Sequence, residues 1–132
     1  MFRSLIIAVA ALATAAPLAA QSADSMVGSI AGLARRTLGH DRPIVPAALD
    51  QQTVRRGALT AQVQACGGQW QTKSYLPYMA QLRATGRYSE KQMAYVGVLH
   101  GIAQQVVLKS LESRAEPCPA RMRAAVAAAI GR

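Results

Sequence analysis

The sequence predicts an all-α protein: a compact bundle of about five helices around a central apolar helix over about 90–113, closed by one disulfide. Apolar residues recur at helical spacing in successive segments, and Gly or Pro ends each of these segments. No segment alternates polar and apolar residues as a half-buried strand does, and no internal repeat is present. The two cysteines, Cys66 and Cys118, are suitably placed to cross-link such a bundle.

Residues 1–20 predict a cleavable secretory signal peptide. Arg3 supplies a positive charge, an apolar run of about ten residues follows, and Pro17 precedes a stretch of small residues. The apolar run is shorter than the ~20 residues that span a bilayer. We expect cleavage after Ala20, which leaves residues 21–132 as a single helical domain in the periplasm or outside the cell. The alternative is a buried N-terminal helix of a cytosolic protein.

Two helices are expected in the first half of this domain. Apolar residues at helical spacing predict one over 24–38, and the glycine after it is a typical helix end. Two prolines interrupt the next stretch. A second helix then begins between about Ala47 and Gln51 and runs to Cys66, although Gly57 should weaken it because glycine is a poor helix former.

A third helix is expected to start around Ser74 and to end at Gly86. Pro77 falls in its first turn, where the missing backbone N–H is tolerated. A final helix, rich in alanine, is expected over about 120–130, after a Pro-Cys-Pro break.

The central helix over about 90–113 has the strongest signals. Ser89 and Gln92 form a capping-box pattern at its start, and apolar residues cover most of its circumference, which is typical of a helix surrounded by others. Gly97 and Gly101 lie one turn apart and would let a neighbouring helix approach closely, within the monomer or between copies.

The cysteine pair favours a disulfide. In an oxidising compartment an even number of cysteines is usually paired, and Cys66 and Cys118 would close a loop of about 50 residues. Two thiols are too few for a zinc site, and the chain has no C-x-x-C redox motif. We therefore expect no bound metal.

The chain is strongly basic. Its formal net charge is +9, with 15 Lys and Arg against 6 Asp and Glu, and arginine greatly outnumbers lysine. Arginine suits bidentate contacts with carboxylate or phosphate. The basic residues are scattered, so they are either solvated helix faces or a surface for an acidic protein or, peripherally, an anionic envelope surface. Export makes nucleic acid an unexpected partner.

Catalytic chemistry has few residues to use. There are six carboxylates and two histidines, and none of the metalloprotease, serine-hydrolase, P-loop or dinucleotide motifs is present. We predict no catalytic residue and no cofactor. The alternative is a small ligand or substrate held in a polar pocket around His100, with Tyr95 and Gln104 beside it on the same helix. A hydrogen-bonded packing role for His100 is the competing interpretation.

The aromatic residues concentrate in one stretch of the chain, between residues 70 and 95. Tyr, Trp and Arg are enriched at binding hot spots, and two arginines fall in the same stretch. The competing interpretation is that the rings cover the core. The predicted partner-binding residues are Trp70, Tyr75, Tyr78, Arg83, Arg87 and Tyr88.

The segment from Met93 to Ala103, followed by Cys118-Pro119 and a terminal helix, resembles the core of the Tai-type immunity proteins. The resemblance covers about 40 residues and implies a periplasmic inhibitor of a type VI amidase toxin. The cysteine spacing and helical layout also look like the HdeA-like acid-stress chaperones. This chain departs from both in its strong basic charge and in the long segment before Cys66.

Together these observations favour a non-catalytic periplasmic binding protein that acts through a protein–protein interface. The versions that we expect are an immunity-type inhibitor, a chaperone or an accessory subunit of an envelope complex. The partner is expected to be another protein, and an acidic one. The alternatives are the small-ligand or enzyme role around His100 and binding to anionic envelope components.

Overall fold

The computed structural model describes the backbone of residues 18–131 and the side chains from Ala23 onward. This part of the chain is all-α, with no strand, which confirms the predicted fold class. One short π-helical segment, η1, runs directly into α3. In chain order the elements are α1 (Leu18–Thr37), α2 (Ala47–Ala65), η1 (Gln71–Tyr75), α3 (Leu76–Ala84), α4 (Glu90–Glu112) and α5 (Ala120–Ile130).

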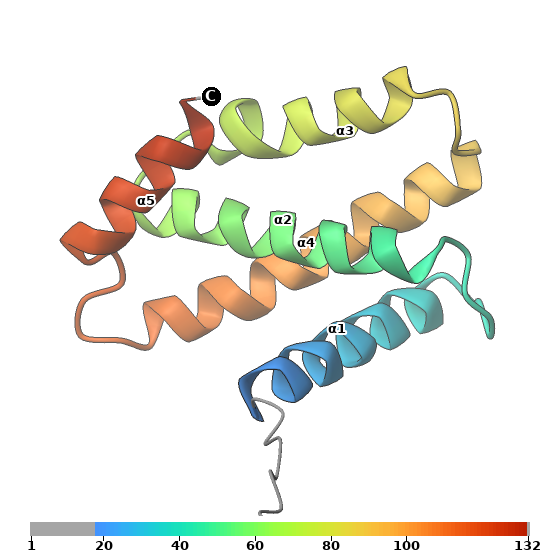
Figure 1. The fold of residues 1–132 in the computed structure, drawn as a ribbon, viewed down its shortest axis with the longest axis horizontal. Coiled ribbons are helices and arrows are strands. Elements are labelled where there is room, and N and C mark those ends of the chain that lie inside the picture. Colours follow the sequence, from blue (N-terminus) through green and yellow to red (C-terminus); the bar gives the residue numbers. More distant parts are fainter. Residues whose placement is uncertain (1–17, 132) are drawn as a thin grey trace, which may run out of the picture.

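Helix α4 is the centre of the bundle, as the sequence predicts. It runs behind α2 with α1 on one side and α3 on the other (Figure 1). The predicted capping box opens it: the Ser89 hydroxyl accepts from the Gln92 N–H, and the Gln92 side chain accepts from the Ser89 N–H. The same Gln92 side chain donates to the Ile44 carbonyl at 3.0 Å, which fastens the α1–α2 connection to α4.

Helices α2 and α4 make the closest contact in the molecule, and Gly57 allows it. A Cβ atom at this position would lie 2.7 Å from both the Ala103 Cβ and the His100 carbonyl oxygen. Gly57 is thus required by close helix packing and is not simply a weak point of α2. The expected packing glycines behave differently, because Gly101 has no heavy atom within 4 Å of where its Cβ would be.

The third helical segment begins earlier than the sequence indicates, with the π-helical turn η1 at Gln71. Pro77 explains this turn. Proline has no N–H to donate to the Lys73 carbonyl, and its ring would clash with that group in a regular α-helix. The wider turn, in which the Leu76 N–H donates to the Gln71 carbonyl, lets the helix continue through the proline.

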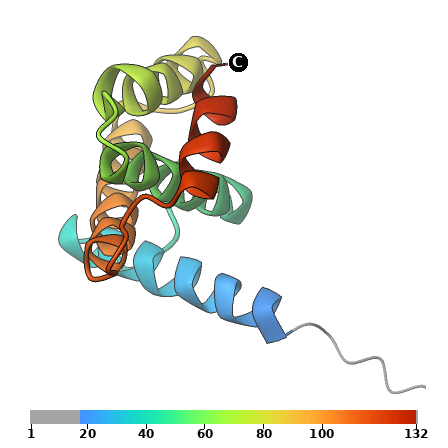
Figure 2. The same ribbon diagram turned by 90° about the vertical axis from the view of Figure 1, so that its left-hand side faces the viewer.

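Helix α1 begins at Leu18, six residues before the predicted start. Its second half packs on the bundle through Ile30, Ala31 and Ala34, whereas its first half extends away from the other helices (Figure 2). The predicted cleavage after Ala20 falls in the first turn of this helix. The apolar run of the predicted signal peptide lies outside the described residues.

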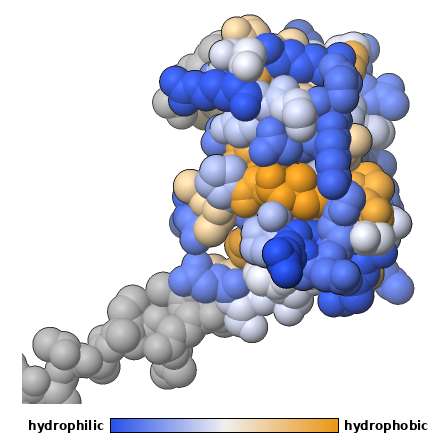
Figure 3. All heavy atoms as spheres, turned by 90° about the vertical axis from the view of Figure 1, so that its right-hand side faces the viewer, coloured by the Kyte–Doolittle hydropathy of each residue, from blue (hydrophilic) through white to orange (hydrophobic). Residues whose placement is uncertain are grey.

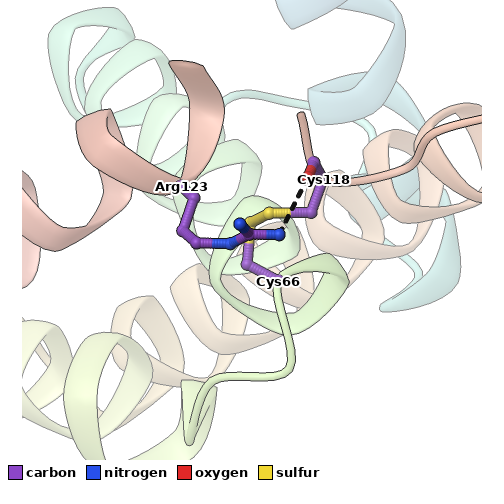
Figure 4. The surroundings of a disulfide bond; sticks show 3 residues. All are labelled: Cys66, Cys118 and Arg123. Atoms are coloured by element: carbon purple, nitrogen blue, oxygen red, sulfur yellow. Dashed lines mark hydrogen bonds between the residues drawn. A yellow bond between two sulfur atoms is a disulfide. The ribbon is translucent and has the colours of Figure 1, made fainter. Parts of the chain in front are cut away.

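The predicted disulfide between Cys66 and Cys118 is present (Figure 4). It joins the end of α2 to the residues just before α5, and Arg123 donates to the Cys118 carbonyl at 3.4 Å. Helix α5 buries only Val126 completely. A cross-link that closes a loop of this size stabilises a fold by about 4 kcal/mol in the chain-entropy model. The disulfide is therefore the main attachment of α5.

Within the described part of the chain, no helix is both long and apolar enough to cross a membrane.

Candidate functional site

The structure does not bring the six predicted partner-binding residues into one patch. Arg83 and Arg87 are exposed, and three aromatic side chains are half-buried. Trp70 lies at the start of η1, so the 1.5 Å helical rise places it about 20 Å along the axis from Arg83. The three half-buried aromatic residues are Trp70, Tyr75 and Tyr88.

A groove between α3 and α4 contains two of the six predicted partner-binding residues, Tyr75 and Arg83. Tyr75, Met79 and Arg83 are spaced four residues apart and form one wall, and α4 forms the other. The groove has a volume of about 340 Å³. Gly97 lies in its lining, where a Cβ atom would meet the Tyr75 hydroxyl at 3.4 Å, an ordinary van der Waals contact. The residues lining it from α4 are Glu90, Met93, Ala94, Gly97 and Val98.

The end of the molecule where α3 stops and α4 starts has a mixed surface. Figure 3 shows a band of hydrophobic residues across this end, with hydrophilic residues above and below it. Exposed Arg83 and Arg87 lie at the end of α3 and in the connection to α4, whereas Leu76, which is 53% exposed, lies at the start of α3. Apolar surface next to unpaired arginine is the composition that protein interfaces favour.

Tyr78 lies in the core, and only a small part of its side chain reaches the cleft between α2 and α3. Its side chain is 3% exposed, and its hydroxyl is hydrogen-bonded to the Thr53 hydroxyl at 2.6 Å. Burial raises the pKa of Tyr78, so its hydroxyl stays protonated. This burial favours the core interpretation of Tyr78 over the predicted partner contact, because the face of α3 that points toward α2 carries this residue.

His100 is held in a buried hydrogen-bond network. The Thr60 hydroxyl donates to the Arg56 carbonyl, and it contacts the Ser74 hydroxyl at 2.6 Å and His100 Nε2 at 3.0 Å. A hydroxyl has one hydrogen and two acceptor positions. Ser74 and the His100 Nε2–H must therefore both donate to Thr60, which fixes the histidine tautomer.

The surroundings of His100 keep it neutral. The side chain is 1% exposed, and its ring centroid lies 4.8 Å from that of Tyr75 and 6.1 Å from that of Tyr78. Burial, assisted by the nearby Arg56 charge, lowers the pKa of His100 to about 4. A ligand can reach this side chain only if the bundle opens. The arrangement matches the packing interpretation of His100.

Tyr95 and Gln104, the other two residues of the predicted pocket, are buried in separate hydrogen bonds. The Tyr95 hydroxyl donates to Asp50 Oδ1 at 2.8 Å. Burial raises the pKa of both groups, and the hydrogen bond to the carboxylate raises that of Tyr95 further. Gln104 donates to the Gln64 side chain at 2.7 Å. The structure distributes the predicted pocket residues along α4 and does not gather them around one cavity.

The described residues contain no group of three His, Cys, Asp or Glu side chains that could hold a metal ion. The polar residues that do come together are ones that sequence reasoning missed, namely Thr53, Arg56, Thr60 and Ser74. Their spacing on α2 offers a weak signal, since Thr53, Arg56 and Thr60 lie three and four residues apart on one helix face.

No family model, no curated protein and no solved structure matches this chain. The resemblance to Tai-type immunity proteins and to HdeA-like chaperones therefore rests on the quoted residues alone.

Proposed function

We propose that this protein is a non-catalytic binding protein, and that its partner is an acidic protein contacted through the α3–α4 face. This face consists of the groove between the two helices together with the exposed residues Leu76, Arg83 and Arg87. The observation that carries the proposal is a groove lined by both Met79 and Met93 together with the exposed arginine Arg83. Arginine and aromatic side chains beside apolar surface are typical of interface hot spots.

The charge of the chain supports an acidic partner. Its net charge is +9, and within residues 23–131 neither Arg83 nor Arg87 is paired with a carboxylate. Glu90 is the acidic residue at the groove. It lies in the first turn of α4, where its negative charge interacts favourably with the positive end of the helix dipole. Unpaired surface arginines attract an acidic partner and raise its rate of association.

The buried polar network supports a non-catalytic role. His100 is neutral, hydrogen-bonded and closed off from solvent, and the Asp50 carboxylate is occupied by Tyr95. General acid–base catalysis needs a titratable group within reach of a substrate. The small-ligand or enzyme alternative around His100 would need the bundle to open.

We also propose that the protein is exported and that it has one of three roles. Export through residues 1–20 would bring the chain into an oxidising compartment, which suits its disulfide. In the periplasm it would act as an immunity-type inhibitor, a chaperone or an accessory subunit of an envelope complex. The segment from Met93 to Ala103 and Cys118-Pro119 supports the inhibitor version by resemblance.

The test has two stages. Crosslinked capture of the protein from its native periplasmic and envelope fraction, with mass spectrometry, identifies a partner. The affinity of that purified partner is then measured for the wild type, for Arg83→Ala/Arg87→Ala, and for a control, Arg114→Ala/Arg121→Ala. The control removes two exposed arginines from the α5 end of the molecule, opposite the α3–α4 junction (Figure 1).

We expect Arg83→Ala/Arg87→Ala to weaken binding at least about tenfold and the control to weaken it much less. An equal loss in both variants, together with steep weakening by salt, would instead favour binding of anionic envelope components through charge alone. Unchanged affinity in both variants would remove this face from consideration.

A further inference from the structure

A second concave site lies on the other side of α3, between α3 and α2. It has a volume of about 260 Å³. Gln52 and Arg56 are four residues apart on α2, and Tyr78 and Gln81 are three residues apart on α3, so helical spacing brings one face of each helix to the site. Its lining residues are Gln52, Arg55, Arg56, Leu59, Tyr78 and Gln81.

This cleft is rich in hydrogen-bond donors and has no carboxylate in its lining. Two guanidinium groups and two side-chain amides surround it. Among residues 23–131, no carboxylate pairs with either Arg55 or Arg56. The Nε–H of Arg56 is buried without an acceptor. Because this nitrogen is closed off from the cleft, the donors that can meet a ligand are the other N–H groups of Arg55 and Arg56 and the two side-chain amides.

The cleft is also held in shape by the core. The Arg56 guanidinium lies 5.9 Å from the centroid of the Tyr78 ring, within the range of a cation–π contact. The Tyr78 ring is itself fixed by the hydrogen bond between its hydroxyl and Thr53. Arg56 is therefore positioned before any ligand arrives, which lowers the ordering cost of binding.

We propose that this cleft between α2 and α3 binds an organic carboxylate. Arg56 and Arg55 meet the two carboxylate oxygens, and the amides of Gln52 and Gln81 flank them. A guanidinium matches a carboxylate in a bidentate geometry. Half-buried Leu59, with the small exposed part of Tyr78 beside it, offers apolar surface to the carbon skeleton of the ligand, which an inorganic anion would leave uncovered.

The bound carboxylate group belongs either to a small free acid or to an acidic side chain of a protein. The site does not depend on the α3–α4 face, because Tyr78 and Gln81 lie on a different side of α3 from Tyr75, Met79 and Arg83. Failure of either proposal would leave the other intact.

The experiment is an NMR titration of the full chain with sodium benzoate, in parallel with inorganic phosphate and with the neutral analogue benzyl alcohol. We expect saturable shifts of the Gln52, Tyr78 and Gln81 signals with benzoate, and at least tenfold weaker binding of phosphate and benzyl alcohol. A short Glu-containing peptide that binds through the same signals more tightly than benzoate would assign the carboxylate to a protein.

Substitutions locate the binding. Arg56→Gln should weaken benzoate binding at least tenfold. Arg56→Lys should weaken it less, because lysine keeps the positive charge but not the bidentate geometry of the guanidinium. Arg114→Gln is the control and should leave binding unchanged. If Arg56→Gln does not fold, Gln52→Leu/Gln81→Leu removes both exposed amides and should still weaken binding severalfold.

His100 provides a second readout. Burial and the Arg56 charge both hold its pKa down, so a carboxylate bound at Arg56 should move that pKa toward its ordinary value. Absence of saturation with benzoate, equal binding of phosphate, or unchanged binding in both Arg56→Gln and Gln52→Leu/Gln81→Leu would each overturn the proposal.

Discussion

Two helix contacts in this bundle differ in their spacing. Helices α2 and α4 pack closely, whereas α3 packs on them at a greater distance. At the first, Gly57 has no side chain, so the α2 backbone lies directly against Ala103 and the His100 carbonyl of α4. At the second, the long side chains of Tyr78, Met79 and Leu82 hold α3 away from the rest of the bundle. The close contact leaves no room for a ligand. The wide one produces a groove or cleft on each side of α3, and both proposed sites lie there.

The two contacts also differ in chemistry. The wide one includes two buried hydroxyl pairs, Thr53 with Tyr78 and Thr60 with Ser74. Buried hydroxyls must be paired, and only one register of α3 and η1 on α2 makes both pairs. The network thus specifies where α3 sits without close backbone packing.

The largest effect is expected from filling the close contact. Gly57→Ala places a methyl group against a backbone carbonyl that cannot rotate away, so α2 and α4 must separate. We expect a loss of about 3 kcal/mol of unfolding free energy, measured by urea denaturation. The control Gly101→Ala meets no atom within 4 Å and should be neutral or stabilising by up to about 1 kcal/mol. Equal stability of the two variants would show that the contact is not close-packed.

The next largest effect is expected from acid, which should lower the unfolding free energy through buried His100. Between pH 6.5 and about pH 4 the unfolded chain binds a proton at His100 that the folded chain does not, so the unfolding free energy falls as the pH is lowered. The full shift corresponds to at most about 3 kcal/mol. The raised pKa of Asp50 acts in the opposite direction.

Subtracting the pH profile of His100→Gln from that of the wild type isolates the histidine, because the contributions of other groups cancel. An unchanged profile would mean that His100 titrates normally in the folded protein.

The smallest effect tests the hydroxyl pairs. Tyr78→Phe leaves the Thr53 hydroxyl unpaired in the core and should cost about 1–2 kcal/mol. Tyr75→Phe is the matched control, because the Tyr75 hydroxyl lies at the α3–α4 groove and has no hydrogen-bond partner among residues 23–131. Thermal unfolding of both variants, of Thr53→Ala and of Tyr78→Phe/Thr53→Ala checks this. A double variant less stable than the sum of its parts contradicts a pairwise bond.

The sequence by itself determined the helices and the cross-link. Capping at Ser89, apolar spacing along α4 and the pairing of two cysteines are local or compositional signals, and they predicted α4 and α5 to within a residue or two, the disulfide, and α2 with its start placed between Ala47 and Gln51. The sequence placed the start of α1 six residues too late and did not predict the π-helical turn before Pro77, because the ends of helices depend on weak competing interactions.

Only the tertiary structure decided which side chains meet. Helical periodicity says that Tyr78 and His100 lie on some apolar face, but it does not say which partner that face will find. The distance between helices settles this. Gly57 draws α2 onto α4, α3 is left farther out, and Tyr78 must then point inward to fill the space, whereas Arg83 is left at the surface. The same spacing exposes Arg56 to a cleft that no local pattern in the sequence reveals.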